Sequence, residues 1–254
     1  MRCPQTLAAL TASAAVLMIA AACSSVTIGG SKTMGSGSSR TTVGAATTFP
    51  IQAPSSPWTN LVEGSSLAAW RGYKSDTVPA GWTAKDGVLS KERPVRDIVS
   101  RDEYGDFELM LEWKITRGGN AGIFYRGTEE YDHIYWSAPE YQLLDDDNAP
   151  DGKNPLTQAA TDYALYPRFD GKLKPVGEWN ETRIVARGAH VEHWLNGTKT
   201  VDYEFWSEDW KARVKLSKFK DWPNYGLARR GRIALQGDHA GSLAFRNIKI
   251  RELR

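Results

Sequence analysis

Apolar and polar residues alternate along several short segments in the second half of the chain. The clearest is 104–116, where Phe107, Leu109, Leu111 and Trp113 share one side of an extended backbone and acidic residues occupy much of the other. Because successive side chains of a strand point to opposite faces, this pattern predicts a half-buried β-strand. Comparable patterns occur in 120–127, 139–146, 179–205 and 231–253.

Turn residues separate these segments. Asp86-Gly87 and Asn196-Gly197 tolerate the positive φ of tight hairpin turns, so each predicts a hairpin. One segment, 207–219, has a helical character instead, since Ser207 precedes two acidic residues and lysines follow toward its end. Many short strands with one or two short helices predict an all-β antiparallel sandwich.

The first part of the chain has a different composition. Residues 1–22 contain an early arginine and an apolar stretch that ends at Cys23, which predicts a signal peptide. Three alanines before Cys23 are similar to a bacterial lipoprotein box, so we expect an exported bacterial protein, periplasmic or at the cell surface, anchored by acyl chains on Cys23. Cleavage of a plain signal peptide nearby is the alternative. Residues 23–57 predict a flexible Ser/Thr/Gly/Pro-rich tether, and residues 58–254 the globular domain.

Composition narrows the function only a little. The formal net charge is +2, from 32 Lys+Arg against 30 Asp+Glu, which argues against a nucleic-acid partner. The chain has 10 Trp, 10 Tyr and 7 Phe, and such rings either fill a core or pack against the faces of sugars. The cysteine count allows no internal disulfide in the mature protein, because Cys3 lies within the predicted signal peptide.

Segments 177–204, 210–219 and 231–253, together with 118–127 and 139–146, resemble the 3-keto-disaccharide hydrolase domain family. The resemblance extends over 67–253. It implies a concanavalin-like jelly roll and an activity on carbohydrates whose C3 hydroxyl has been oxidised to a ketone. It also implies a metabolic partner, an upstream sugar oxidoreductase that supplies the ketone.

Cleavage of such a sugar requires a base for the C2 proton, a group that stabilises the developing enolate, and an acid for the leaving oxygen. Strand alternation places Arg126, Glu140 and Gln142 on faces that would converge with Gln236, while the turn 236–241 presents polar side chains nearby. We therefore predict Glu140 and His239 as the acid/base residues. The residues predicted to bind substrate are Arg126, Gln142, Gln236, Asn120, Asp145, Asp238 and Trp194.

The sequence also allows other functions for these residues. The spacing of Glu140, Gln142 and Asp145 is similar to the Glu-x-Asp-x-x-Glu of retaining glucanases, with an amide and a shorter acid in place of two members. A carbohydrate-binding module and an inactive relative kept for adhesion are further alternatives.

Several single residues also allow two interpretations of their role. Arg126 could pair with Glu129 or Asp132 on a surface hairpin, and a divalent cation could bind the aspartates 145–147 or Glu140 with residues 238–239. His193 shares its parity with apolar neighbours, which predicts a buried structural histidine.

Overall fold

The computed structural model describes residues 56–254. The predicted signal peptide at 1–22, the lipidation site Cys23 and all but the end of the 23–57 tether lie outside the described residues. In the part of the chain that the structure describes, no helix is long and apolar enough to cross a membrane.

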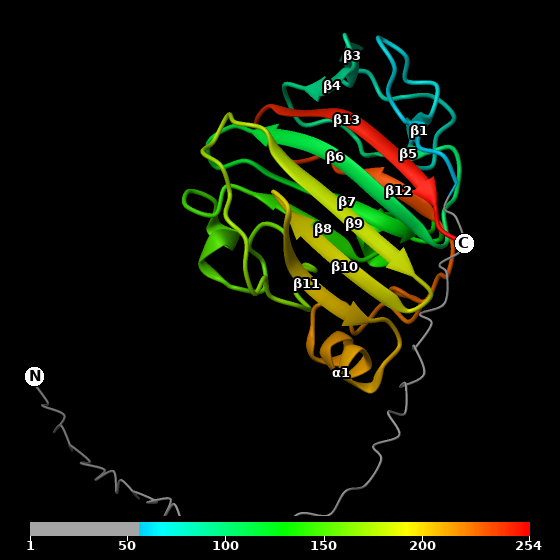
Figure 1. The fold of residues 1–254 in the computed structure, drawn as a ribbon, viewed down its shortest axis with the longest axis vertical. Coiled ribbons are helices and arrows are strands. Elements are labelled where there is room, and N and C mark those ends of the chain that lie inside the picture. The colour runs from blue at the N-terminus through cyan, green and yellow to red at the C-terminus, as the bar shows by residue number, and fades with distance from the viewer. Residues whose placement is uncertain (1–55) are drawn as a thin grey trace, which may run out of the picture. The chain divides into compact units, whose positions relative to one another are not determined.

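Two antiparallel sheets pack face to face (Figure 1). The 8-stranded sheet contains β1 (Thr59–Asn60), β3 (Thr83–Lys85), β4 (Val88–Lys91), β6 (Phe107–Ile115), β9 (Asn180–Arg187), β10 (His190–Leu195), β11 (Thr198–Glu204) and β13 (Leu243–Glu252). Its order is β11-β10-β9-β6-β13-β4-β3, and β1 pairs with β13.

The second sheet has 5 strands in the order β2-β5-β12-β7-β8. These are β2 (Trp70–Gly72), β5 (Ile98–Ser100), β7 (Asn120–Gly127), β8 (Glu140–Leu144) and β12 (Arg232–Leu235). The pairings between these strands are antiparallel, and strands distant in sequence become neighbours, as with β12 between β5 and β7. The predicted all-β antiparallel sandwich is therefore confirmed.

The space between the sheets holds the core, and β6 shows why the alternation predicts it. Phe107, Leu109, Leu111 and Trp113 face inward and are at most 1% exposed. Burying each such side chain contributes roughly 2 to 3 kcal/mol. The Trp113 indole still needs a partner in this environment, and it donates to Thr182 Oγ1 at 2.9 Å.

His193 is also part of this core, as predicted. Its side chain is fully buried, and its Nε2 lies 2.8 Å from the Tyr125 hydroxyl. Burial disfavours the charged imidazolium and lowers the pKa of His193 to about 3. The ring is therefore neutral at physiological pH and serves the packing between the two sheets.

The predicted helix is α1 (Glu208–Leu216), which lies beside β11 (Figure 1). Ser207 caps it, since its Oγ accepts from the Trp210 amide at 3.1 Å. Glu208 and Asp209 occupy its first turn and basic residues its last turn, which suits the helix dipole. The hairpin turn between β10 and β11 is also confirmed, with φ of 49° at Asn196 and 80° at Gly197.

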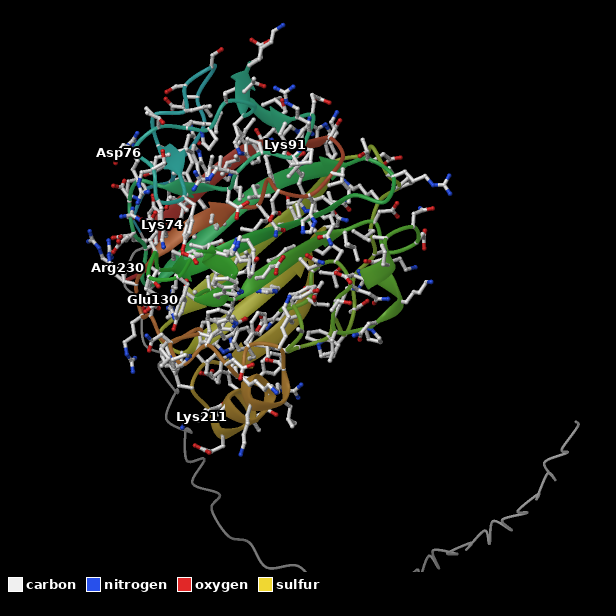
Figure 2. The ribbon with its side chains drawn as sticks, turned by 180° about the vertical axis from the view of Figure 1, so that it is seen from behind. Lys74, Asp76, Lys91, Glu130, Lys211 and Arg230 are labelled. Carbon is white, nitrogen blue, oxygen red and sulfur yellow. The ribbon has the colours of Figure 1, made fainter. Side chains whose placement is uncertain are left out.

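A layer of loops covers the outer face of the 5-stranded sheet, which Figure 2 shows from behind the view of Figure 1. The layer includes two short 3₁₀ helices, η1 (Ile134–Trp136) and η2 (Pro150–Lys153). Ile134 of η1 packs against Phe124 and Ala234 of the sheet, and Ala149 and Ala159 pack against Leu144. Between these two contacts the layer encloses a hollow on this face, lined by residues of β7, β8 and the segment after β12.

Candidate active site

The hollow is a cavity of about 250 Å³. Its lining is mainly polar and comes from strands and loops that are distant in sequence: Asn120, Tyr135, Glu140, Gln142, Asp151, Tyr163, Lys218, Gln236, Asp238 and His239. The structure thus brings the two predicted acid/base residues into one pocket together with Asn120, Gln142, Gln236 and Asp238.

Strand register explains this convergence. β7 and β8 pair so that Gly122 lies opposite Gln142, and Glu140 opposite Phe124. On the other side of β7, the Gln236 amide donates to the Gly122 carbonyl at 3.0 Å, immediately after β12 ends. Side chains with the same parity on neighbouring strands share a face, so these polar groups all point outward, away from the core.

Glycine at position 122 makes room for the Glu140 carboxyl. A Cβ on Gly122 would lie 2.2 Å from Glu140 Oε1 and 2.8 Å from its carboxyl carbon, well inside van der Waals contact. The Glu140 side chain therefore lies directly over this glycine. The motif 118–122 has a steric role here that the strand pattern does not reveal.

Burial controls the ionisation of Glu140. The residue is only 6% exposed, and burial raises its pKa from the ordinary 4.5 to about 8. The Lys218 ammonium opposes this rise, whereas Asp162, Asp97 and Asp238 add to it. The carboxyl group therefore holds a proton near neutral pH, as a general acid must.

This raised pKa predicts a pH-dependent stability. Between about pH 4.5 and 8 the folded protein retains a proton on Glu140 that the unfolded chain releases, so the stability that this group contributes is lost as the pH rises. In urea unfolding at about pH 5 and about pH 9, Glu140→Gln should gain stability relative to the wild type at the higher pH. Parallel pH profiles for the two proteins would contradict the prediction.

Two buried ionisable residues hold the turn that carries His239. Asp97 Oδ1 accepts from the Gly237 amide at 2.8 Å, and Lys91 Nζ donates to the carbonyls of His239 at 2.7 Å and Gly241 at 3.0 Å. Asp97 is 8% and Lys91 1% exposed. Burial raises the pKa of Asp97 to about 7. These contacts fix the backbone and leave the His239 side chain 44% exposed at the pocket, with Nε2 3.8 Å from Asp238 Oδ1.

We expect Lys91→Met to lower stability by about 1 to 3 kcal/mol, because the His239 and Gly241 carbonyls lose the buried ammonium that donates to them. At temperatures where the variant is fully folded, kcat/KM for the sugar cleavage that the sequence resemblance implies should still fall several-fold, since the turn no longer holds His239 in place. Urea unfolding and steady-state kinetics measure the two effects. Lys85→Met, at an exposed position on β3, is the matched control and should change neither. An activity equal to the wild type in folded Lys91→Met would contradict this role.

Arg126 does not face the pocket, and the prediction that it converges with Glu140 is wrong. Its guanidinium donates to the carbonyls of Gly105 and Gly188 at 2.9 Å each and pairs with Asp106 at 3.2 Å. The alternative pairing with Glu129 or Asp132 does not form either, because the residue is 2% exposed and bound to these backbone groups. Arg126 therefore links the loop at 105–106 to the turn at Gly188.

A β-bulge explains the error. Tyr125 and Arg126 of β7 lie opposite the single residue Ile233 of β12, and Arg126 has a φ of 53°. Such an insertion interrupts the two-residue alternation of the strand. Side chains before the bulge follow the predicted parity, whereas Arg126 lies within the bulge and turns away from the face that Glu140 occupies.

Asp145 and Trp194 also lie outside this pocket. Asp145 accepts from the Gly118 amide at 2.7 Å and from Asn148 at 2.8 Å, and it lines a different cavity of about 720 Å³ together with residues 146–147. Glu140 and Asp145 thus do not form the carboxylate pair of a retaining glucanase. Trp194 lies on β10 of the other sheet, where its indole donates to Glu192 at 2.9 Å, so its predicted place at the site is wrong.

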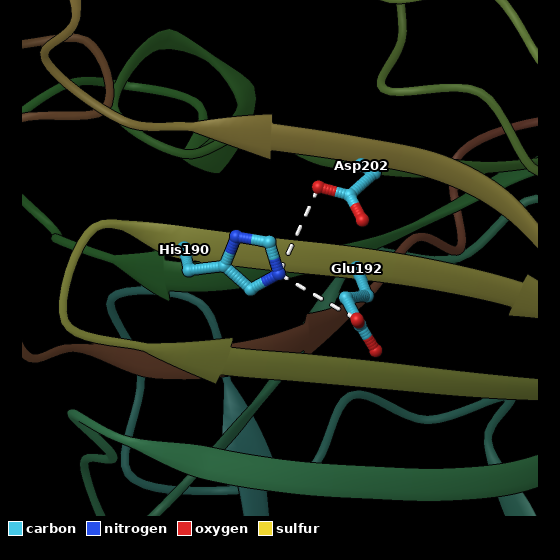
Figure 3. Close-up of side chains that lie close together, drawn as sticks. All are labelled: His190, Glu192 and Asp202. Carbon is cyan, nitrogen blue, oxygen red and sulfur yellow. Dashed lines mark ion pairs between the residues drawn. The ribbon is translucent and has the colours of Figure 1, made fainter. Parts of the chain in front are cut away.

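A group with metal-binding side chains also lies on the 8-stranded sheet (Figure 3). His190 Nε2 is 3.5 Å from Glu192 Oε1 and 3.7 Å from Asp202 Oδ1. The Lys199 ammonium lies 2.7 Å from both carboxylates, so the group already has a cationic partner within the protein. His190, Glu192 and Asp202 are the three residues, among those that the structure describes, whose side chains are close enough together to hold a metal ion. None of the three lines the pocket.

Sequence reasoning missed several pocket residues. Lys218 follows α1, and its ammonium lies 4.2 Å from the centre of the Tyr163 ring. The Tyr163 hydroxyl in turn donates to Asp151 Oδ2 at 3.1 Å, while Tyr135 comes from η1. These residues belong to irregular segments without a strand pattern, so no periodic signal could have placed them.

The chain matches a known family over most of its length. A family model described as the 3-keto-alpha-glucoside-1,2-lyase-like domain matches residues 57–251. The chain belongs to this family. Among relatives of this lyase-like domain, a "3-keto-disaccharide hydrolase" of Bacteroides thetaiotaomicron is 34% identical over 225 residues, which cover 76% of this chain and 77% of the relative.

Solved structures are also similar to this chain. A crystal structure from Parabacteroides distasonis, described as that of a glycosyl hydrolase, is 33% identical, with a TM-score of 0.73 over 78% of this chain and 94% of the other. An endo-beta-1,3(4)-glucanase of family GH16 has a TM-score of 0.51 at 8% identity over 81% of this chain and 93% of its own. This second likeness concerns the fold alone and matches the expected concanavalin-like jelly roll.

Proposed function

We propose that this protein is a hydrolase or lyase that cleaves 3-keto-glycosides by elimination at C1 and addition of water. The family supports this reaction, and so does the name of the Bacteroides thetaiotaomicron relative. The observation that carries the proposal is that Glu140 and His239, from β8 and from the turn after β12, line one small polar pocket. A non-catalytic sugar-binding module requires no such pair of an acid and an imidazole.

The chemistry follows from the ketone, which makes the C2–H bond acidic. His239 takes this proton as the base, and the electrons form an enolate whose oxygen receives hydrogen bonds from Gln142 and Gln236 and charge stabilisation from Lys218. The enolate then collapses, the C1–O bond breaks, and Glu140 gives its proton to the leaving oxygen. Water adds to the resulting enone, with hydroxyl at C1 and hydrogen at C2, which completes the hydrolysis.

The test is an assay of the purified protein with a 3-keto-glucoside, with release of the C1 group measured over a range of pH. We expect release, with kcat/KM decreasing as the pH rises through about 8, where Glu140 loses its proton in the free enzyme. Binding of the sugar without release would refute the catalytic proposal. A rate that rises through the same pH range would reverse the assignment of acid and base.

We also propose that the protein is exported and anchored through acyl chains on Cys23, because residues 1–22 have the layout of a signal peptide. The substrate must come from a sugar oxidoreductase that converts a C3 hydroxyl to a ketone. Labelling with a radioactive fatty acid tests the anchor: label should enter the wild type and be absent from Cys23→Ser. Label in both proteins, or in neither, would refute it.

A further inference from the structure

The pocket has room for one sugar ring. Its volume of about 250 Å³ is below the roughly 300 to 1,000 Å³ of cavities that enclose drug-sized ligands. Its acid/base residues, Glu140 and His239, line this pocket, so the sugar ring that carries the ketone must occupy the pocket. If the substrate is a disaccharide, as the proposed function allows, its second ring has to lie on the rim of the pocket.

Two stacked tryptophans lie beside the pocket, since the ring centre of Trp136 is 5.6 Å from that of Tyr135, which lines the pocket. The rings of Trp136 and Trp222 lie with their centres 4.1 Å apart and their planes at 10°. Both are partly exposed. They belong to the segments that supply pocket residues, since Tyr135 precedes Trp136 and Lys218 comes shortly before Trp222. The stack therefore connects the segment of Tyr135 to the segment of Lys218.

Neighbouring side chains hold this stack in place. Tyr131 meets Trp222 edge-on at 5.1 Å, and His133 meets Trp136 edge-on at 4.7 Å. Asn224, beyond Trp222, also donates to Glu130 at 2.9 Å, and Glu130 is labelled in Figure 2. A surface that is fixed before the ligand arrives loses little conformational entropy on binding.

We propose that the Trp136–Trp222 stack binds the leaving sugar of a disaccharide and so makes the protein selective for disaccharides over simple 3-keto-glycosides. The inference rests on the proposed function and adds to it a second binding position. Aromatic rings offer the C–H faces of a sugar a large, rigid apolar surface. The stack touches the departing ring and leaves the reacting atoms to the pocket residues.

Two substrates that differ only in the leaving group test this role: a 3-keto-disaccharide of two glucose units and methyl 3-keto-glucoside. For Trp222→Ala and Trp136→Ala we expect KM for the disaccharide to rise about tenfold, as loss of an aromatic contact implies. Turnover of the methyl glycoside should stay within about twofold of the wild type. Trp222→Phe, which keeps a ring, should recover most of the loss, and Trp194→Ala on the other sheet is the control.

Equal losses on both substrates would mean that the stack only maintains the pocket, and unchanged KM for the disaccharide would mean that it binds no sugar. Either result overturns the inference. If the wild type cleaves neither substrate, the proposed function fails, and binding of the unoxidised disaccharide then decides about the stack. Tryptophan fluorescence titration should show about tenfold weaker binding in Trp222→Ala, with glucose affinity unchanged; equal affinities for the disaccharide would refute it.

Discussion

Glu140→Gln should lower kcat/KM for a 3-keto-disaccharide by about 10³-fold, within the range that general acid–base catalysis contributes. The amide has nearly the same shape but cannot give a proton to the departing sugar oxygen. The loss should be much smaller on a nitrophenyl 3-keto-glucoside, because nitrophenolate leaves without protonation. Steady-state kinetics on both substrates measure this difference.

The two substrates distinguish a role of Glu140 as the acid for the leaving oxygen from other roles of this residue. Glutamine at 140 removes a group whose ionisation is already disfavoured by burial, so the variant should fold and should still bind the unoxidised sugar. Equal losses on both substrates would move Glu140 to another role, such as the base at C2. Full activity on the disaccharide would exclude it from the chemistry.

Gly122→Ala should abolish most of the activity, by about 10²-fold or more, and lower stability by about 1 to 3 kcal/mol. The new Cβ would lie 2.2 Å from Glu140 Oε1, 2.8 Å from its carboxyl carbon and 2.9 Å from its Cγ, so the Glu140 side chain has to move. The carboxyl then leaves the position in which it meets the leaving oxygen, and a displacement of this size is enough for such a loss. Steady-state kinetics measure the loss of activity, thermal unfolding measures the change in stability, and a crystal structure of the variant shows the position of the Glu140 carboxyl.

Gly105→Ala is the matched control. A Cβ there would meet nothing closer than the Arg229 carbonyl at 3.4 Å, an ordinary contact, so activity and stability should both be retained. A fully active Gly122→Ala would show that the Glu140 carboxyl does not need its observed position. A variant that fails to fold would show that the glycine serves the sheet and not the site.

The pattern of the chain was sufficient for most of the fold and for the core of the site. Alternation along 107–113 places its apolar side chains between the sheets, and Ser207 marks the start of α1. Parity also predicts that Glu140 and Gln142 point outward on β8, where they line the pocket. These properties depend on neighbours within a few residues, so the sequence alone carries them.

What only the tertiary structure decided depends on contacts between distant segments. The bulge opposite Ile233 turns Arg126 away, and buried Lys91 and Asp97 fix the turn of His239. Irregular loops bring Lys218 to the pocket and place the Trp136–Trp222 stack against Tyr135. By itself the sequence determined the strands, their faces and the chemical groups on them. Which of these groups meet depends on the order of β12, β7 and β8 and on the loops that pack over them. Strand pairing and burial involve residues that are far apart in the chain, so the alternation within one segment does not reveal them.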